Sequence, residues 1–385
     1  MERILIDAFG NNSWIGGLYY KYNIIYSLLQ NEYIVDHCEL FVMVDSSSQK
    51  LFEKFKDAVT LINVNITSHR DCQFKIIINY IKYRCNYFYC GFESWYRLFG
   101  VNEICWIPDF QAKESPHNFS AREVEKWDKI YGKISRDHRP LVLSSHDSYH
   151  SFRKYYGSQK KKEVYIVPFV SYIEPTLSRV SQCDEIEIIS RYKLTGIKYA
   201  CIMNQFWKHK NHKVVFEAIS KLKKSNNCPL TFVFTGKMED YRNPDYTEYI
   251  KKIIDDNNLN DNIRILGFIE RNEQLVIMKN ASFVIQPSLF EGWGTVVEDA
   301  KVLNKTILLS DIPVHREQMN MKCKLFDPHN PEELAQLISE EMFIEHNDNI
   351  EFGIADMHKR AKEYSKGFER LLRDREGRNR WINES

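Results

Sequence analysis

The sequence predicts an α/β protein built from two doubly wound parallel sheets. Along most of the 385 residues, short runs of β-branched and aromatic residues alternate with segments of helical period, as in successive βαβ units. Several of these runs end in a glycine or a short polar loop, the position at which open parallel sheets bind ligands. A chain of this length can form two domains, each with its own core.

Composition and charge exclude several classes of protein. Lysine and arginine (53 residues) nearly balance aspartate and glutamate (52), which argues against nucleic acid as the main partner. The nine cysteines include no CxxC pair, so we expect neither a disulfide framework nor a zinc site, but a reduced cytoplasmic protein. No run approaches the ~20 apolar residues that span a bilayer, and the opening MERILIDAF lacks the apolar core of a signal peptide.

In the first half of the chain, a glycine pair follows the first predicted strand. The segment GNNSWIGGLYY predicts a polar loop that contains Gly16 and Gly17 and opens onto a helix at Tyr19–Leu29. Glycines before a helix let the backbone approach a ligand closely, although a plain tight turn has the same composition. The predicted strands of this half are Ile4–Phe9, Glu39–Val44, Ala58–Val64, Ile104–Ile107, Leu141–Ser145 and Tyr165–Phe169.

The segment Arg70–Gly100 is both basic and aromatic. Its many Tyr, Phe, Ile and Trp residues follow Arg70 and are interspersed with the cations Lys75, Lys82, Arg84 and Arg97 and with only two acids, Asp71 and Glu93. Such a segment can lie on an anionic membrane surface. Helices whose long cations extend over a core have the same composition, so both interpretations stay open at this point.

Strands and helices alternate through the second half as well. A polar stretch at about Ser171–Thr195 precedes them, and we predict that it links the two domains. A polar helical segment, Phe352–Leu372, follows them. The predicted strands are Lys198–Met203, Thr231–Thr235, Ile263–Leu266, Ser282–Gln286 and Thr306–Ser310.

A lysine stands directly after the first strand of the second half. Lys210 precedes a helix whose predicted apolar face is Val214, Val215, Ala218, Ile219 and Leu222. A cation at a strand end, beside the N-terminus of a helix, suits a pyrophosphate, because charge and backbone donors converge there. A solvated surface lysine is the alternative.

The stretch Gln286–Gln318 combines a carboxylate, two glycines and a helix start. Gly292 and Gly294 mark a tight turn with Glu291 at its tip, and the period becomes helical from Thr295. Asn304 is a plausible left-handed residue at the end of this helix. The stretch therefore predicts a ligand site at the carboxyl end of a parallel strand.

The same helix carries two adjacent acids. At about 100° per residue, Asp299 lies about 90° from the centre of the apolar stripe, whereas Glu298 lies nearly opposite it. A residue on the flank of the stripe can face a ligand, and one on the far side usually meets water. We therefore expect Asp299 to belong to the site, with Glu298 as the alternative.

These segments together resemble a known family. SLFEGWGTVVEDAK followed by LLSDIPVHREQ is similar to the donor-site signature of family-4 glycosyltransferases, retaining enzymes of the GT-B fold. The resemblance implies two Rossmann-like domains facing a cleft. An acceptor-side domain would span residues 1–172 and a nucleotide-sugar-binding domain residues 173–355, with a C-terminal helix at about 356–385 that rejoins the first.

The resemblance also implies roles for particular residues. Glu291 would bind hydroxyls of the donor sugar, Lys210 its phosphates, and Asp299 or Glu298 the ribose of the nucleotide. Backbone groups near Ile269 would hold the base, and Asp109 lies in the strand-end loop PDFQ that faces the acceptor. The other residues placed at the donor are Gly16, Gly17, Gln205, Gly292, Trp293, Gly294 and Thr295.

Three positions depart from the family pattern. Asp299 replaces the usual glutamate, and Gln205 replaces an arginine of the phosphate clamp, for which His209 or Lys208 would have to compensate if they are not simply exposed loop residues. Ala112 stands where close relatives often have a histidine, so no general base is assigned to that loop.

A serine, a histidine and an aspartate follow one another at residues 145–147. This invites comparison with a hydrolase triad. Consecutive residues cannot form a triad, and no nucleophile elbow surrounds the serine.

The chain lacks the DxD pair that metal-dependent transferases use, so we expect fixed cations and helix dipoles to stabilise the leaving diphosphate, without a metal or other cofactor. The resemblance implies a retaining, metal-independent hexosyltransferase. It would move sugar from a UDP- or GDP-sugar to a glycan or lipid-linked glycan in O-antigen- or capsule-type synthesis, in the cytoplasm or on the cytoplasmic membrane face. The alternatives are a sugar-nucleotide epimerase of the same fold and a non-catalytic binding subunit.

Overall fold

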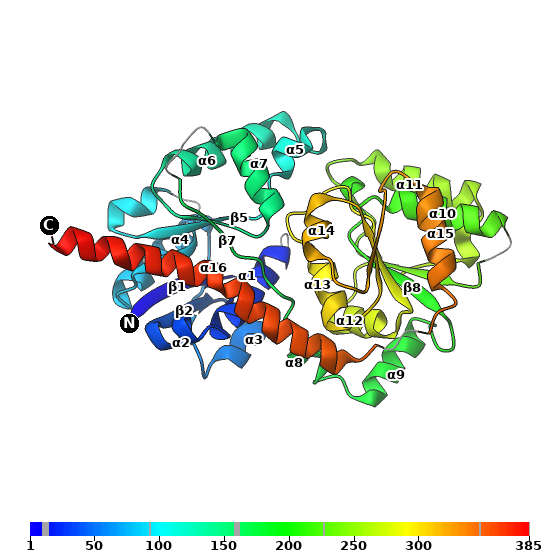
Figure 1. Ribbon diagram of the computed structural model, residues 1–385, viewed down its shortest axis with the longest axis horizontal. Coiled ribbons are helices and arrows are strands. Elements are labelled where there is room, and N and C mark those ends of the chain that lie inside the picture. Colours follow the sequence, from blue (N-terminus) through cyan, green and yellow to red (C-terminus); the bar gives the residue numbers. More distant parts are fainter. Residues whose placement is uncertain (10–14, 92–93, 158–161, 226–227, 346–347, 385) are drawn as a thin grey trace. The chain divides into compact units, whose positions relative to one another are not determined.

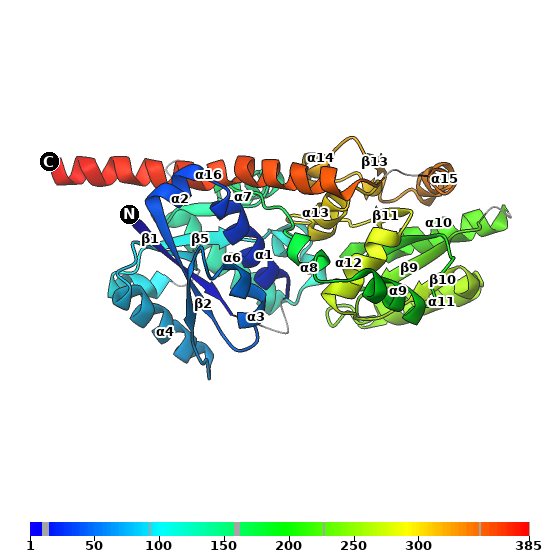
Figure 2. The same cartoon turned by 90° about the horizontal axis from the view of Figure 1, so that it is seen from below.

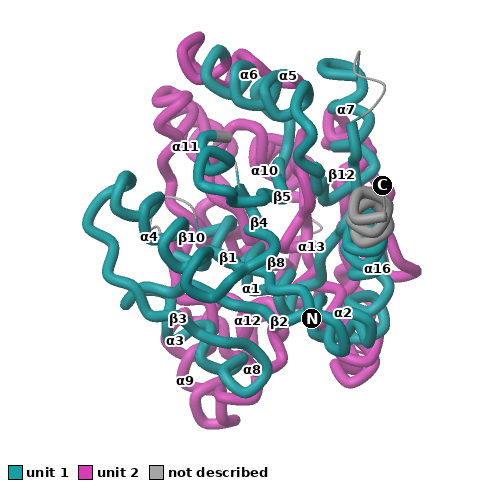
Figure 3. The backbone as a smooth tube through the Cα atoms, turned by 90° about the vertical axis from the view of Figure 1, so that its left-hand side faces the viewer, with its two compact units in different colours: residues 1–113, 125–172, 358–385 teal, residues 114–124, 173–357 magenta. Residues whose placement is uncertain are grey.

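The computed structural model describes residues 1–9, 15–91, 94–157, 162–225, 228–345 and 348–384. The chain divides into two compact units, drawn in teal and magenta in Figure 3. Unit 1 comprises residues 1–113, 125–172 and 358–385, and unit 2 comprises residues 114–124 and 173–357. Each unit has its own parallel sheet with helices on both faces (Figure 1), which is the predicted fold class.

The sheet of unit 1 has seven strands in the order β3-β2-β1-β4-β5-β6-β7, and every neighbouring pair is parallel. The predicted strands are present, with ends that differ by a few residues. Strand β4 was not predicted, because its aromatic run lies inside the basic segment and lacks a flanking Gly or Pro signal on its N-terminal side. The strands are β1 (Glu2–Ala8), β2 (Cys38–Val44), β3 (Thr60–Asn63), β4 (Tyr87–Gly91), β5 (Glu103–Ile107), β6 (Leu141–Leu143) and β7 (Val164–Ile166).

Both faces of this sheet are covered by helices, so its inner strands are buried on both sides, whereas the edge strands β3 and β7 are partly exposed. Because side chains alternate along a strand, Leu5, Phe41 and Phe88 point to one face and share a core cluster with helix α4 (His69–Lys82). Tyr89 points to the other face, where its ring meets Phe368 of the C-terminal helix. Figure 2 shows the two helices on opposite faces of the sheet.

Helix α1 (Ile15–Leu29) begins earlier than the sequence predicts. Gly16 and Gly17 lie in its first turn, not in a loop before it, and the residues 10–14 of the predicted loop lie outside the described residues. Glycine is tolerated in a first turn because those N–H groups have no partner within the helix. The other helical segments up to α7 are α2 (Glu32–His37), α3 (Gln49–Phe52), η1 (Glu53–Phe55), η2 (Ser94–Phe99), α5 (Gln111–Glu114), η3 (Pro116–Asn118), α6 (Ala121–Arg136) and α7 (His146–Tyr156). Of these, η3 and the first residues of α6 group with unit 2.

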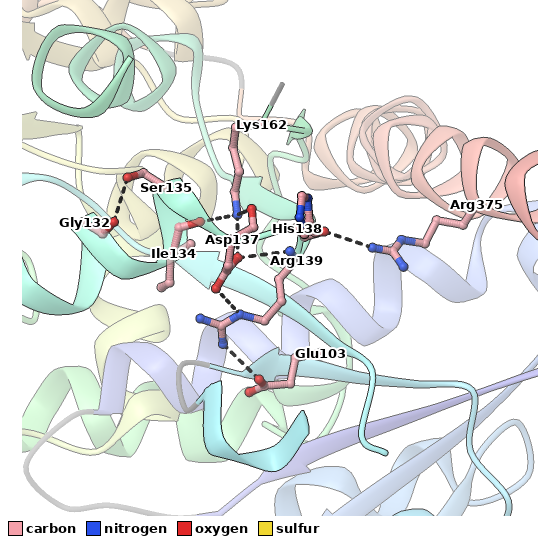
Figure 4. A network of polar contacts seen from close by, with 9 residues as sticks. All are labelled: Glu103, Gly132, Ile134, Ser135, Asp137, His138, Arg139, Lys162 and Arg375. Carbon is pink, nitrogen blue, oxygen red and sulfur yellow. Dashed lines mark hydrogen bonds and ion pairs between the residues drawn. The ribbon is translucent and has the colours of Figure 1, made fainter. Parts of the chain in front are cut away.

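A buried ion network joins β5, the end of α6 and the approach to β7 (Figure 4). Arg139 donates to Glu103 at 2.9 Å and to Asp137 at 2.7 Å, and Lys162 lies 3.0 Å from Asp137. The four side chains expose at most 14% of their surface. Removing one member would leave a buried charge without its partner, so this network specifies the local packing of unit 1.

The sheet of unit 2 has six parallel strands in the order β10-β9-β8-β11-β12-β13. All five predicted strands are confirmed, and β13 is the additional edge strand. Strands β8 and β11 are neighbours at the centre, so the loops after them meet at the carboxyl edge. The strands are β8 (Tyr199–Met203), β9 (Thr231–Thr235), β10 (Ile263–Ile265), β11 (Phe283–Gln286), β12 (Ile307–Ser310) and β13 (Cys323–Phe326).

Helix α10 (His212–Lys224) buries all five residues of its predicted apolar face. Helix α13 (Thr295–Val302) also begins where predicted, and Asn304 after it has the expected left-handed conformation, with φ of 53°. The remaining helical segments are η4 (Lys208–Lys210), α11 (Asp245–Asp256), η5 (Leu259–Asp261), α12 (Arg271–Asn280), α14 (Pro313–Gln318) and α15 (Pro331–Glu341).

The stretch predicted as a linker is largely helical. Helices α8 (Glu174–Leu177) and α9 (Gln182–Arg191) occupy it, and both pack against α12. A reciprocal capping box between Ser181 and Asp184 starts α9. This Ser-x-x-Asp signal is present in the sequence, but the polar composition around it obscured the helix.

The chain ends in one long helix, α16 (Ile350–Glu384), as the polar helical segment predicts. Its residues to Met357 group with unit 2, and those from His358 group with unit 1. Within unit 1, Asn31 donates to Glu369 at 3.0 Å and Tyr165 donates to Asp374 at 3.0 Å. In the described part of the chain, no helix has the length and apolar character needed to cross a membrane.

Candidate functional site

The site lies at the carboxyl edge of the unit 2 sheet, where the loops after β8 and β11 meet. Glu291 of the second loop is its centre. Its Oε1 atom accepts hydrogen bonds from Lys210 Nζ at 2.6 Å, Ser288 Oγ at 2.7 Å and Gln286 Nε2 at 2.9 Å. The structure thus brings together the two residues on which the sequence interpretation rests.

These contacts keep the Glu291 carboxylate charged although it is largely buried. Burial alone would raise its pKa, but the charge and hydrogen bond of Lys210 outweigh burial and hold the pKa below its usual value. His315 lies behind this site, with Nδ1 2.9 Å from the carbonyl oxygen of Ser310. Burial lowers the pKa of His315, so the imidazole is neutral near pH 7.

Backbone contacts fix the two loops to each other. The N–H of Leu289 donates to the carbonyl of His209 at 2.8 Å. Asn211 donates its side-chain amide to the carbonyls of Pro287 at 3.1 Å and Pro328 at 2.8 Å. Asn211 has φ of 55°, the left-handed region that asparagine tolerates, and this conformation lets η4 turn into α10. Lys210 and Glu291 are therefore held by a rigid frame.

The turn before α13 is clamped by Gln318, the last residue of α14. Its Oε1 atom accepts from the N–H of Gly294 at 3.0 Å, and its Nε2 atom donates to the carbonyl of Gly294 at 3.1 Å. The amide of Gly294, predicted to face a phosphate, is thus already paired, which leaves the following amides of the first turn for a ligand.

The expectation that Glu298 meets water is wrong. Its side chain is fully buried, and its Oε1 atom accepts from Lys301 Nζ at 3.1 Å and from Gln318 Nε2 at 3.0 Å. The helical wheel failed because Gln318 of α14 contacts the side of α13 that carries Glu298. Glu298 is therefore part of the clamp that holds the turn.

Asp299 is also buried, and Arg271 of α12 holds it with two hydrogen bonds. Arg271 Nη1 lies 2.7 Å from Oδ2, and Nη2 lies 2.5 Å from Oδ1. Asp299 exposes 1% of its side chain, whereas Arg271 exposes 20%. The more accessible group of this pair is the guanidinium.

Gln205, which stands at the position of the arginine missing from the expected phosphate clamp, pairs with the backbone. Gln205 turns its Oε1 atom to the N–H of Lys237 at 2.7 Å. His209 is buried, and burial first, then Lys210 and Arg242, lowers its pKa well below the usual value, so it carries no charge near neutral pH. Lys208 is exposed, as the alternative interpretation expected.

The remaining predicted donor residues surround this centre with different exposure. Trp293 is buried, and Gly292 and Thr295 are half-buried. In the loop after β10, Ile269 is half-buried, whereas Phe268 before it exposes 52% of its surface.

The residues singled out in unit 1 have local structural partners. Asp109 accepts from the N–H of Gln111 at 2.8 Å and starts α5, and Ala112 is buried. Ser145 is the N-cap of α7 and accepts from the N–H of Ser148 at 3.0 Å, which accounts for the Ser-His-Asp run.

A separate cavity of about 710 Å³ opens beside the N-termini of α10 and α11. Its lining includes Lys208, Lys213, Arg242, Tyr246, Tyr249 and Leu289, but neither Lys210 nor Glu291. Volume therefore does not identify the site, whereas the convergence of charge on Glu291 does.

Four residues of this site were not predicted as site residues from the sequence: Gln286 and Ser288, which donate to Glu291, and also Arg271 and Gln318. Arg271 lies 28 positions before Asp299, and only the fold brings them together. Gln318 ends the HREQ run that the resemblance includes, and its reciprocal pairing with Gly294 explains why a side-chain amide occupies that position.

The arrangement suits one kind of ligand. A lysine and a helix N-terminus attract phosphate oxygens, and a charged carboxylate accepts hydrogen bonds from hydroxyl groups. A phosphorylated or nucleotide-linked sugar offers both.

Comparison with known proteins agrees with this chemistry. Residues 185–343, which include the whole site, match the family described as glycosyl transferases group 1. No curated protein matches the sequence.

Solved structures match over nearly the whole chain. A glycosyltransferase from Rickettsia africae ESF-5 has a TM-score of 0.64 at 16% identity, covering 94% of this chain and 93% of that one. Anabaena Alr3699/HepE in complex with UDP and glucose has a TM-score of 0.61 at 13% identity and full coverage of both chains. WaaG, a glycosyltransferase involved in lipopolysaccharide biosynthesis, has a TM-score of 0.59 at 11% identity, covering 94% and 95%.

At these identities the structural matches establish the fold, and the family match applies to residues 185–343. The chain has the GT-B fold, and its residues 185–343 are similar to the group 1 glycosyltransferases.

Proposed function

We propose that this glycosyltransferase moves a hexose from a nucleoside diphosphate sugar to a glycan or lipid-linked glycan, with retention of anomeric configuration. The observation that carries the proposal is the convergence of Lys210, Gln286 and Ser288 on one oxygen of Glu291. A buried carboxylate held in this way has its geometry fixed before a substrate binds, which is the condition for electrostatic catalysis.

In this proposal the chain's own groups stabilise the leaving diphosphate. Lys210 and the N–H groups of the first turn of α13 supply positive charge where the bond between sugar and phosphate breaks. Glu291 accepts hydroxyls of the sugar and orients its anomeric carbon. No residue is assigned as a nucleophile, because the resemblance implies front-face attack without a covalent intermediate.

The nucleoside would lie beside Ile269 and α12. Arg271 presents the accessible part of its pair with Asp299, so we assign the ribose hydroxyls to this pair as a unit. UDP is the first nucleotide to test, because Alr3699/HepE binds UDP and UDP-glucose, and a trehalose-phosphate synthase of this fold from Burkholderia xenovorans is described as UDP-forming.

A cell-surface glycan is the acceptor class that we propose. The support is the similarity of fold to WaaG, which acts in lipopolysaccharide biosynthesis.

Incubation of the protein with a panel of UDP- and GDP-hexoses, with and without short glycan acceptors, tests this function. Release of nucleoside diphosphate and an axial product linkage from an axial donor, detected by NMR, are expected. A free epimerised sugar without acceptor would instead identify an epimerase. Binding of no nucleotide sugar at all would identify a non-catalytic subunit.

A further inference from the structure

Helix α4 is apolar on two faces. Ile76, Ile77 and Tyr80 are buried in the core of unit 1. A surface helix normally turns polar side chains outward, as α6 does with exposed Arg122, Glu125, Lys126, Lys129 and Lys133. In α4 the outward face is apolar instead.

Three large apolar side chains form this outward face. Phe74, Ile78 and Ile81 expose 55%, 58% and 59% of their surface. Their spacing places them within about 60° of one another around the helix, so they form one stripe along the 14 residues of α4. No core contact explains side chains of this size in water.

The 3-10 helix η2 extends the stripe into a patch. Leu98 and Phe99 expose 84% and 47% of their surface. The ring of the half-buried Trp95 lies 6.3 Å from the ring of Phe74 and 5.7 Å from that of Phe99, so the two helices form one continuous surface. We call these six residues of α4 and η2 the apolar patch.

Cations surround the apolar patch. Arg70, Lys82, Arg84 and Arg97 are exposed, and none has an ion-pair partner among the residues that the structure describes. Lys75 is paired with Asp71 at 2.7 Å, the one acid of α4. Among the described residues of α4, η2 and the positions that flank them, the charges without an ion-pair partner are therefore all positive.

We infer that the apolar patch docks unit 1 on an anionic lipid bilayer. A helix that lies in the membrane interface buries apolar side chains at the level of the headgroups, while flanking lysines and arginines contact anionic lipid. A second copy of this chain is a poor occupant, because the same four cations would face one another. The cations thus favour an acidic partner surface. The continuous apolar stripe favours a partner surface into which side chains can insert. The inference is independent of the donor site and of the reaction.

Vesicle co-sedimentation of the full chain tests this inference. We expect binding to vesicles with 30% phosphatidylglycerol at about 100 mM salt, weaker binding at about 500 mM salt, and little binding to pure phosphatidylcholine. The variant Phe74→Ser/Ile78→Ser/Leu98→Ser should bind at least tenfold more weakly. Lys82→Ala/Arg97→Ala should bind about 25-fold more weakly, since each cation near the surface contributes about a factor of five.

Matched controls change the same chemistry elsewhere. Ile186→Ser removes another exposed apolar side chain, from α9, and Lys126→Ala/Lys133→Ala removes two exposed cations of α6. Both should bind vesicles like the wild type. Circular dichroism and thermal melting should show that all four variants are folded.

Three results would overturn the inference. The first is that the wild type does not bind anionic vesicles. The second is that the wild type binds neutral and anionic vesicles equally well. The third is that the patch variants bind anionic vesicles as well as the control variants do. A stable dimer that the patch variant dissociates would assign the surface to a second copy instead. Donor turnover is not part of this test, so a wrong reaction assignment would leave its outcome unchanged.

Discussion

The Nζ atom of Lys210 lies 2.6 Å from Oε1 of Glu291, joining the loops after two neighbouring strands of unit 2. Each loop thereby orients the charged group of the other. A donor that binds here has to share Lys210 between its phosphates and Glu291, so binding and sugar orientation are coupled through one ion pair.

Substitution of either partner should abolish turnover without unfolding the protein. Glu291→Ala and Lys210→Ala remove preorganised charges, and each loss should lower kcat by about 10²–10³. Glu291→Gln keeps a hydrogen-bond acceptor and should retain the fold with similarly low activity. Initial rates of nucleotide release with saturating donor measure these effects.

Lys213→Ala is the matched control for Lys210→Ala. Lys213 is a half-exposed lysine in the first turn of α10, with its nearest carboxylate, on Glu217, 3.5 Å away. Its loss should leave kcat unchanged within about a factor of two. Wild-type turnover in Glu291→Ala and Lys210→Ala would contradict the site.

Arg271 should affect nucleotide affinity more than the chemical step. Arg271→Ala leaves Asp299 buried and without its two hydrogen bonds, so we expect stability to fall by about 3 kcal/mol and the Kd for the nucleotide to rise about tenfold or more. The double variant Arg271→Ala/Asp299→Ala removes the orphaned charge and should recover stability but not affinity. Urea unfolding and calorimetric titration separate the two effects. Recovery of both would make the pair purely structural.

Gln318 should act through the turn that it clamps. Gln318→Ala unpairs the N–H of Gly294 and removes one hydrogen bond each from the carbonyl of Gly294, which keeps its bond from the N–H of Glu298, and from the carboxylate of Glu298. We expect a loss of about 1–3 kcal/mol in stability and a larger proportional loss in kcat than in nucleotide affinity, because the loop that carries Glu291 loosens. An effect on stability alone would show that the turn keeps its position without Gln318.

Buried histidines should make the protein sensitive to mild acid. Burial and the charge of Lys210 lower the pKa of His212 from 6.5 to about 3, and its ring stacks on Phe206 at 4.2 Å. Below pH 6.5 the imidazole of His212 binds a proton in the unfolded chain but not in the folded chain. The stabilisation by neutral His212 is therefore complete above pH 6.5 and is lost as the pH falls below it. Between pH 6.5 and 5 this loss amounts to about 2 kcal/mol.

His212→Phe preserves the stacked ring and removes the titration. Urea unfolding at pH 7.5, 6 and 5 should therefore give a shallower loss of stability for the variant than for the wild type. His209 and His315, whose pKa values are also lowered, remain in both proteins and keep some pH dependence. Parallel curves for the two proteins would exclude proton uptake by His212.

The fold class follows from the sequence because local signals agree with the tertiary structure. The strands of unit 2 are short apolar runs, and the face of α10 from Val214 to Leu222 repeats at helical spacing. The early start of α1 and the helices at residues 174–191 were missed, since glycine and polar composition weaken the helical pattern that tertiary packing then supports.

The site was predictable only where its residues are close in sequence or form a known pattern. Lys210 and Glu291 lie 81 positions apart in the sequence, and each was identified through a known pattern. A helical wheel of α13 cannot show that Glu298 is buried, because the helix that covers it, α14, follows a further strand in the sequence. The Arg271–Asp299 pair depends on α12 and α13 lying side by side, which no local period encodes.

The most direct test of the account is a thermal-shift titration with UDP, GDP, CDP and dTDP, with and without magnesium, on the wild type and on Lys210→Ala. A nucleotide at about 100 times its Kd stabilises the folded state by about 2.7 kcal/mol. We predict that one nucleotide raises the Tm of the wild type without metal and that Lys210→Ala loses most of this shift. No shift with any nucleotide, or an equal shift in both proteins, would contradict a donor site built on Lys210 and Glu291.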